Sequence, residues 1–288
     1  MSANTVLPDG WVERLHRLRV GIEVVDALGS PPPVQGIRLH LEQVPGPVAV
    51  LDGPLGAGED DIGLPGVRRH GSGRFAVLFG DGRTSPLDVR ILSTNRRHVP
   101  RRLRIPVPDE ADVVAEQQAH DVPPFPPRTD LRRRPALFPG AAYATQAGAT
   151  VVRGRVVRPA GSPVRWVRVV ARPETQNTPV LGRAHGDDRG EFVLVLASTT
   201  AQLGAPVSLD VTVRVIVTAR LNPPAVTPAG SRDDPLWDLP IEELGISGAP
   251  DPVADGVVDP AGYTSSVSRV LVCPRGRFTH PIEQFVLP

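Results

Sequence analysis

Apolar and polar residues alternate along several short segments of this chain, a pattern that predicts β-strands with one buried face. The longest example is 207–220, where Val or Leu holds every second position from Val207 to Val217 and the residues between are polar except Ile216. Shorter runs lie at 20–25, 37–42, 75–79, 87–91, 101–107, 164–171, 191–196 and 267–273. We therefore predict an all-β chain of antiparallel sheets, because sheets with one solvent-facing side are typically antiparallel.

The pattern of turn and strand occurs twice. Gly29-Ser30-Pro31, a strand at 34–41 and a second turn at 73–75 are repeated as Gly161-Ser162-Pro163, 164–171 and 190–192. A repeat of this kind predicts two copies of one β-domain. Matching 275–288 to 96–108 extends the second copy to the last residue.

Proline and glycine, 34 and 28 residues, mark the connections between the predicted strands. We predict a first β-sandwich at 19–108, a Pro-rich connector at 109–148 and a second β-sandwich at 149–288, with an irregular insertion at 221–262. Short helices are predicted at 9–18 and 109–120. Pro240 to Gly245 predicts one helical turn, because Pro begins helices and Gly ends them.

All 32 basic residues of the 288-residue chain are arginine. Without lysine, the chain can form no Schiff base and no lysine-dependent phosphate loop. The net charge of +1 gives no reason to expect a nucleic-acid partner.

The chain has one cysteine, Cys273, which excludes an internal disulfide. Cys273 lies in a predicted strand, so we predict that its thiol is buried.

No stretch is long and apolar enough for a signal peptide or a membrane span. We therefore expect a cytoplasmic protein, either alone or as part of a particle.

The stretch from Thr150 to Ala197, with Asp187-Asp188-Arg189-Gly190-Glu191-Phe192 at its centre, resembles the carboxypeptidase regulatory-like and transthyretin-like β-sandwich families. The first half departs from that pattern, since its turn at 70–75 lacks the aspartates. The resemblance implies an Ig-like sandwich fold and an accessory, adhesion or assembly role.

Enzymes and cross-linked adhesins with related folds use residues that this chain lacks. An isopeptide cross-link needs lysine, the transthyretin-like hydrolases end in Tyr-Arg-Gly-Ser, and intradiol dioxygenases bind iron through two tyrosines and two histidines. The chain ends in 284–288 without that signature, its tyrosines are Tyr143 and Tyr263, and it has no His-x-His pair. We expect no catalysis, no cofactor and no metal.

Two chemical alternatives remain open for Asp187 and Asp188. Carboxylates in a turn can bind calcium, and they can also stabilise the turn through Asx hydrogen bonds. The second alternative is favoured, because further acidic ligands are missing nearby.

Candidate interface residues are the bulky or basic residues that the repeat leaves unmatched. The strand register predicts an outward Trp166, where the first copy has Gly36. Trp166 is then either an interface anchor or a residue covered by the insertion around Trp237. The other candidates are Arg168, Phe125, Arg132, Arg133, Arg134, Phe138 and Trp237 itself.

We predict a non-catalytic structural or adaptor protein that binds other protein subunits of a larger assembly. A homo-oligomer is the further expectation for its partners. Our preferred instance is an accessory component of a phage-tail-like contractile particle, a contractile injection system. The alternative is a carbohydrate- or peptide-binding accessory module, which would need an exposed aromatic platform.

Overall fold

The structure is a computed structural model that describes residues 18–29, 36–42, 67–69, 73–78, 85–107, 111, 132–197, 210–222, 234–245, 251–277 and 282–288. The elements in these ranges, β1 to β17, are all strands, which confirms the predicted all-β fold. Within the same ranges no helix is long and apolar enough to cross a membrane.

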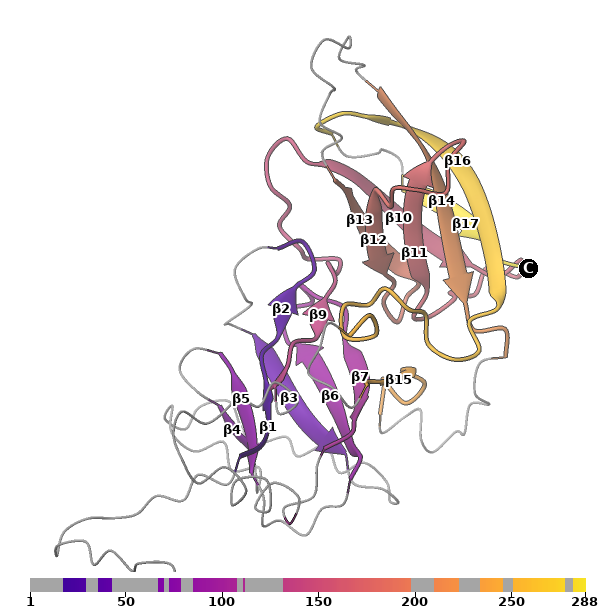
Figure 1. Cartoon of the computed structure of the whole chain (residues 1–288). Coiled ribbons are helices and arrows are strands. Elements are labelled where there is room, and N and C mark those ends of the chain that lie inside the picture. The colour runs from indigo at the N-terminus through magenta and orange to yellow at the C-terminus, as the bar shows by residue number, and fades with distance from the viewer. Residues whose placement is uncertain are drawn as a thin grey trace, which may run out of the picture.

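The strands of the N-terminal half form two four-stranded sheets and one short pair (Figure 1). The first sheet has the order β4-β5-β1-β8, with β4 at Val67–Arg69, β5 at Phe75–Leu78, β1 at Leu18–Ile22 and β8 at Arg132–Arg133. The second has the order β15-β7-β6-β3, with β15 at Ile241–Glu243, β7 at Arg101–Ile105, β6 at Leu87–Ser93 and β3 at Ile37–Glu42. The pair consists of β2, Val25–Asp26, and β9, Ala136–Leu137.

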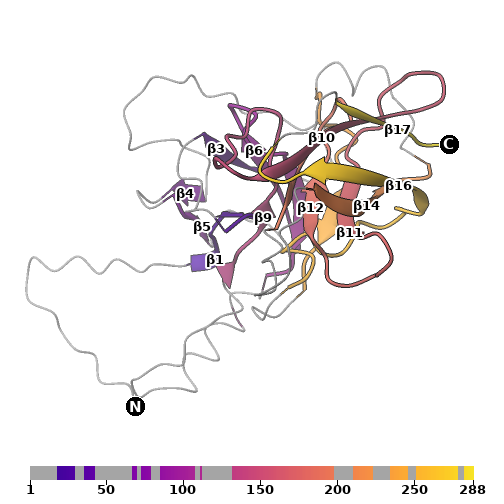
Figure 2. The same cartoon turned by 90° about the horizontal axis from the view of Figure 1, so that it is seen from above.

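The strands of the C-terminal half form a three-stranded and a four-stranded sheet. The first has the order β13-β10-β17, with β13 at Glu191–Leu196, β10 at Thr150–Val157 and β17 at Glu283–Val286. The second has the order β12-β11-β14-β16, with β12 at Gly182–His185, β11 at Arg168–Pro173, β14 at Asp210–Ala219 and β16 at Ser265–Pro274. Seen from above, β4, β5 and β1 lie apart from β14, β16 and β17 (Figure 2).

Strand pairing follows the same plan in both halves. β1 pairs antiparallel with β5 and parallel with β8, as β10 pairs antiparallel with β13 and parallel with β17. The antiparallel series β3-β6-β7 corresponds in the same way to β11-β14-β16.

The pairing corrects the predicted match between 275–288 and 96–108. By position in the sheets, β7 corresponds to β16, and the last strand, β17, corresponds to β8. The predicted connector 109–148 therefore supplies β8 and β9 to the N-terminal half. Alternation could not indicate these strands, because each has only two residues and is placed by backbone hydrogen bonds.

The predicted helical turn at 240–245 is also wrong, because residues 241–243 form β15, which pairs parallel with β7. Helix propensity is a weak local preference, and at this position tertiary contacts outweigh it. The predicted helix at 9–18 lies outside the described residues except for Leu18, which belongs to β1. Of the predicted helix at 109–120, the structure describes only Ala111.

Each half has its own hydrophobic core. Alternate residues of β14, Val213, Val215 and Val217, are fully buried, as the sequence pattern predicts. Cys273 is buried in the same core, also as predicted. The core of the N-terminal half includes Leu244, which follows β15 in the chain and comes from the insertion. The N-terminal half is therefore completed by a segment that lies late in the sequence.

Gly190, in the second turn of the repeat, lies in close contact with neighbouring backbone. A Cβ at Gly190 would lie 2.5 Å from the carbonyl oxygen of Val156 and 2.8 Å from that of Val164, at a φ of +71°. Because both neighbours are backbone, we expect Gly190→Ala to lower the free energy of unfolding by about 3 kcal/mol or more.

Gly161→Ala is the matched control, measured with Gly190→Ala by chemical denaturation. Gly161 has a similar φ of +85°, but nothing lies within 4 Å of an added Cβ. This change should cost only about 1 kcal/mol, the penalty of the left-handed backbone alone. Equal losses in the two variants would contradict the close packing at Gly190.

Candidate functional site

The most unusual group of side chains is a buried ion cluster where the two halves meet. Glu242 of β15 accepts hydrogen bonds from Arg101 of β7, with Nε–Oε1 at 3.1 Å and Nη2–Oε2 at 2.7 Å. Its Oε1 also accepts a hydrogen bond from Nη2 of Arg168, the first residue of β11, at 3.0 Å. One carboxylate therefore joins the N-terminal half, the insertion and the C-terminal half.

The guanidinium of Arg101 uses every N–H that it has. Besides Glu242, its Nη1 donates to the carbonyl oxygens of Ala136 and Ala254 at 2.7 and 2.6 Å, and its Nη2 donates to that of Val253. Five donors thus find five acceptors, which a buried guanidinium needs if it is not to destabilise the fold. Arg101 holds the connector and the insertion against the N-terminal half.

On the C-terminal side, Arg168 is held by contacts with Trp166 and Tyr263 in addition to Glu242. Its Nη1 donates to the carbonyl oxygen of Trp166 at 3.2 Å, and its guanidinium lies 5.6 Å from the ring centre of Tyr263. The Tyr263 hydroxyl donates to the same Trp166 carbonyl at 2.6 Å. Burial raises the pKa of Tyr263 to about 12, so the hydroxyl stays protonated and remains a donor.

Burial alone would raise the pKa of Glu242, but the charges and hydrogen bonds of Arg101 and Arg168 outweigh it and lower the pKa. The carboxylate is therefore ionised at neutral pH, and the cluster of two arginines and one glutamate carries a net charge of +1. The backbone carbonyl oxygens around the arginines offset this excess of positive charge.

Trp166 lies beside this cluster and is only 3% exposed. Its Nε1 donates to Oδ1 of Asp238, in the insertion, at 2.8 Å. The structure thus shows the second of the two alternatives, in which the insertion covers the ring. Trp166 has a φ of 60° and Gly36, its counterpart in the repeat, a φ of 72°, so both halves share a left-handed residue just before a strand.

His185, at the end of β12, is a fully buried imidazole at the same junction. Its ring stacks on Phe138 with 3.8 Å between the ring centres. Burial lowers the pKa of His185 well below its usual value, and the positive charges of Arg168 and Arg101 lower it further. The imidazole is therefore neutral at physiological pH.

A second buried polar group lies next to β2. Oδ2 of Asp26 accepts a hydrogen bond from the Tyr143 hydroxyl at 2.8 Å and lies 3.2 Å from Nε2 of His98. Burial favours a higher pKa for Asp26, but hydrogen bonds from His98, Leu28 and Tyr143 lower it overall. This carboxylate ties together three segments of the chain.

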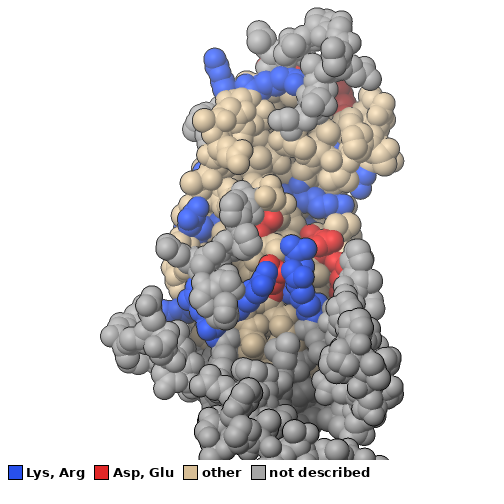
Figure 3. Space-filling view, turned by 60° about the vertical axis from the view of Figure 1, so that its left-hand side comes forward, with Lys and Arg blue, Asp and Glu red and all other residues tan. Residues whose placement is uncertain are grey.

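Two buried carboxylates of the sheet β15-β7-β6-β3 are paired with arginines. Glu42 of β3 pairs with Arg90 and, at 2.6 Å, with Arg102. Asp88 pairs with Arg104 at 2.8 Å. Figure 3 shows arginine and acidic side chains side by side on one face of the molecule.

Six of the predicted interface residues fall into two groups, one buried and one exposed. Trp166, Arg168, Phe138 and Arg133 are buried, and the first three lie at the junction. Arg132 and Arg134 are exposed and pair with Glu23. Trp237 is half-buried in the insertion, and Phe125 lies outside the described residues.

The carboxylate of Asp187 stabilises its own turn. Oδ1 of Asp187 accepts hydrogen bonds from the backbone N–H groups of Arg189 and Glu191, both at 2.9 Å. Its Oδ2 pairs with the Arg189 guanidinium at 3.2 Å. These are the Asx hydrogen bonds of the favoured alternative. In the described ranges no three His, Cys, Asp or Glu residues are grouped so as to hold a metal ion.

Sequence reasoning missed Glu242 and Arg101 as partners. The sequence pattern places Arg101 in the predicted strand 101–107 and Glu242 in the predicted helical turn 240–245. The two residues are 141 positions apart, and no motif connects them. The only signal was that an acidic segment interrupts a proline-rich insertion.

A scan against protein-family models found no match, and searches of curated proteins and of solved structures found none either.

Glu242→Gln tests the ion cluster. The amide keeps the shape of the side chain but leaves Arg101 and Arg168 buried without a counter-charge, so we expect the free energy of unfolding to fall by about 3–5 kcal/mol. The measurement is urea denaturation at neutral pH.

Glu243→Gln is the matched control. The Glu243 side chain is 73% exposed and pairs only loosely with Arg104, at 3.5 Å, so its loss should change stability by about 0.5 kcal/mol or less. Similar effects of the two substitutions would show that the buried carboxylate has no special role.

The burial of His185 leads us to predict that the free energy of unfolding falls in acid. Because its pKa is lowered in the folded protein, the unfolded chain takes up this proton first as the pH falls below about 6.5. Stability should therefore fall with decreasing pH from that point, with a slope of up to about 1.4 kcal/mol per pH unit. The pKa of Glu242 is also lowered, but its contribution is lost only below about pH 4.5, so His185 is the first of the two to respond as the pH falls.

His185→Gln, compared with the wild type by denaturation between pH 7 and about pH 5, isolates this contribution. The variant should be less stable at pH 7 but should lack most of the slope. An unchanged slope in the variant would assign the acid sensitivity to other groups.

Proposed function

We propose that this protein is a non-catalytic structural or adaptor component of a larger assembly, in which two β-sandwich copies act as one rigid unit. The observation that carries the proposal is the buried junction, where Glu242 joins Arg101 of one half to Arg168 of the other. A fixed relative position of two modules is what a structural subunit needs, whereas flexible linkage suits independent binding modules.

Corresponding strand orders support the proposal of two tandem sandwiches of the transthyretin-like or carboxypeptidase regulatory-like kind. Three strands of each sheet pair in the same order and directions in the two halves, and each half has a left-handed residue, Gly36 or Trp166, before the matching strand. Two hydrophobic cores, one in each half, fit the same interpretation.

The use of the titratable side chains supports a role without catalysis. His98 and Tyr143 both bond to Asp26, His185 stacks on Phe138, and Glu242 is enclosed by two arginines. These side chains are buried, so they serve the fold and do not face a substrate.

An apolar surface on the C-terminal half supports binding to other proteins. Val270 and Val272 of β16 are 45% and 62% exposed, and Val286 of β17 is 47% exposed. β16 and β17 are each the last strand in the order of their sheets, and a salt bridge between Arg269 and Glu283 connects them. Exposed apolar side chains along strand edges are typical of protein-binding surfaces.

The finer proposal is an accessory subunit of a phage-tail-like contractile particle, located in the cytoplasm where such particles are built. Copies of the same chain are a further proposed partner.

The alternative, a carbohydrate-binding module, loses its main support because Trp166 is buried and cannot serve as an aromatic platform.

The experiment is co-expression with the products of neighbouring genes, followed by size-exclusion chromatography with light scattering. We expect a complex of fixed stoichiometry, weakened at least tenfold by the double substitution Val270→Asp and Val272→Asp. The control is Val257→Asp, since Val257 is 44% exposed but lies in the insertion. A protein that stays monomeric and binds none of these products would contradict the proposal.

A further inference from the structure

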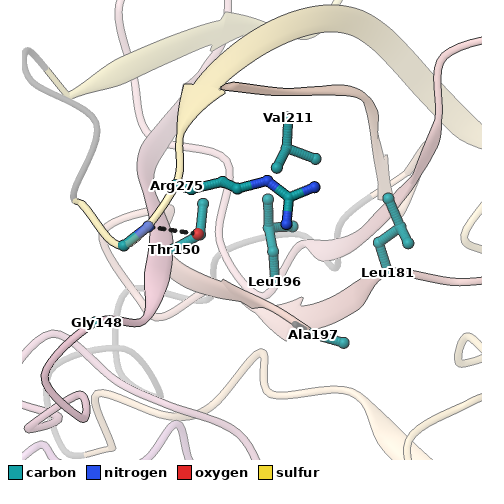
Figure 4. Close-up of a pocket in the computed structure, with 8 residues that line it drawn as sticks. Gly148, Thr150, Leu181, Leu196, Ala197, Val211 and Arg275 are labelled. Carbon is teal, nitrogen blue, oxygen red and sulfur yellow. Dashed lines mark hydrogen bonds between the residues drawn. The ribbon is translucent and has the colours of Figure 1, made fainter. Parts of the chain in front are cut away.

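The surface carries a pocket and a charged cluster, which differ in what they can recognise. The pocket, in the C-terminal half, is lined mainly by aliphatic side chains, those of Leu181, Leu196, Ala197 and Val211 (Figure 4). Arg275 crosses it but is already engaged in another contact, so the lining selects no class of ligand. The charged cluster, three arginines on the N-terminal half, does select one, because it carries an excess of positive charge.

Strand alternation places these arginines around one carboxylate. In the run Arg132-Arg133-Arg134, successive side chains point to opposite faces, so Arg133 is buried and its two neighbours are exposed. β8 pairs in parallel with β1, and the N–H of Glu23, directly after β1, donates to the carbonyl oxygen of Arg133 at 2.9 Å. Glu23 therefore lies beside both exposed arginines, and Arg74, just before β5, reaches it as well.

The Glu23 carboxylate is shared by three guanidiniums. Nε and Nη2 of Arg74 donate to its Oε1 at 3.3 and 3.0 Å. Nε of Arg132 donates to Oε2 at 3.0 Å, as does its Nη2, and Nε of Arg134 lies 3.4 Å from the same oxygen. The Glu23 side chain is 11% exposed, whereas the side chains of Arg74, Arg132 and Arg134 are 60%, 54% and 59% exposed. A partner can therefore reach the arginines but not the glutamate.

One carboxylate does not balance these three cations. Burial alone would raise the pKa of Glu23, but the hydrogen bonds and charges of Arg132 and Arg74 outweigh it and lower the pKa, so the carboxylate is ionised at neutral pH. Three positive charges and one negative charge leave +2 in the cluster, more than the +1 of the whole chain. Each guanidinium directs at most two of its five N–H donors to Glu23.

The spacing of the arginines favours an extended acidic partner. Arg132 and Arg134 are two residues apart on one face of a strand, a distance of about 6.6 Å. An extended segment with acidic residues at alternate positions presents two carboxylates on one face at the same spacing, and a guanidinium fork matches a carboxylate. β8 is the last strand in the order of its sheet, where cross-strand pairing of opposite charges is favourable.

We propose that Arg74, Arg132 and Arg134 bind an extended acidic segment of a partner protein, with carboxylates at alternate positions. This inference rests on the proposed function as a subunit that binds other proteins, and it adds the chemistry of one partner surface.

The test is an NMR titration of the full chain with the capped peptide Thr-Glu-Val-Glu-Thr at neutral pH and low salt. We expect saturable shifts of the backbone amides of Glu23, Arg74 and Arg133, with a Kd on the order of 1 mM that rises at least threefold between about 20 and about 200 mM salt. Thr-Gln-Val-Gln-Thr, which has the same shape without the charges, should bind at least tenfold more weakly.

The double substitution Arg132→Gln and Arg134→Gln should weaken binding of the acidic peptide at least tenfold. The matched control is Arg155→Gln, which removes an exposed arginine from β10, the strand that corresponds to β1, and should leave binding unchanged. Arg74→Gln alters the most exposed of the three side chains and should weaken binding at least threefold, which covers the case in which the double variant fails to fold.

The proposal is overturned if the acidic peptide causes no saturable shifts, if the glutamine peptide binds equally well, or if the folded double variant binds like the wild type. Tighter binding of a hexathymidylate oligonucleotide at the same amides would also overturn it, by assigning the cluster to nucleic acid. A stable complex with the neighbouring gene products, combined with no peptide binding, would overturn this inference and leave the proposed function in place.

Discussion

The arrangement of the two halves depends on one buried carboxylate. Glu242 sits on β15, a three-residue strand that is added in parallel to the edge of β7. So short a strand offers few backbone hydrogen bonds. The carboxylate adds charged hydrogen bonds to Arg101 and Arg168, and Leu239 and Leu244 on either side of β15 are buried. Polar contacts fix the position of the insertion, and apolar contacts hold it there.

Buried ion clusters do not stabilise proteins simply by existing, because removing charges from water costs several kcal/mol per ion. Here the cost is offset by complete hydrogen bonding of Arg101 and by backbone carbonyl oxygens that face the excess positive charge. The ion cluster matters more for the relative position of the two halves than for the net free energy of unfolding. The observed placement of the insertion lets one carboxylate bond to an arginine of each half, so the cluster links the two halves at a defined position.

The sequence predicted the strands whose apolar residues alternate, because burial of one face leaves that pattern. Val213, Val215 and Val217 are buried as expected. The repeat aligned Trp166 with Gly36, but it did not indicate the left-handed backbone that the two residues share. The sequence did not predict β8, β9 or β15. These strands have two or three residues each, too few for a period, and their places are set by partners far away in the chain.

The candidate site was predictable only in part, for the same reason. Trp166, Arg168 and Phe138 were identified as residues suited to an interface, and they do lie at an interface, but one inside the chain. Their partners Asp238, Glu242 and His185 have no spacing that relates them to these residues. Long-range charge pairing leaves no periodic signal in a single sequence.

Scanning calorimetry of the wild-type chain tests most directly the claim that the junction makes one rigid unit of the two halves. If the ion cluster couples them, the protein unfolds in a single transition whose calorimetric and van't Hoff enthalpies agree. Two separate transitions, each with the enthalpy expected of one half, would contradict the account.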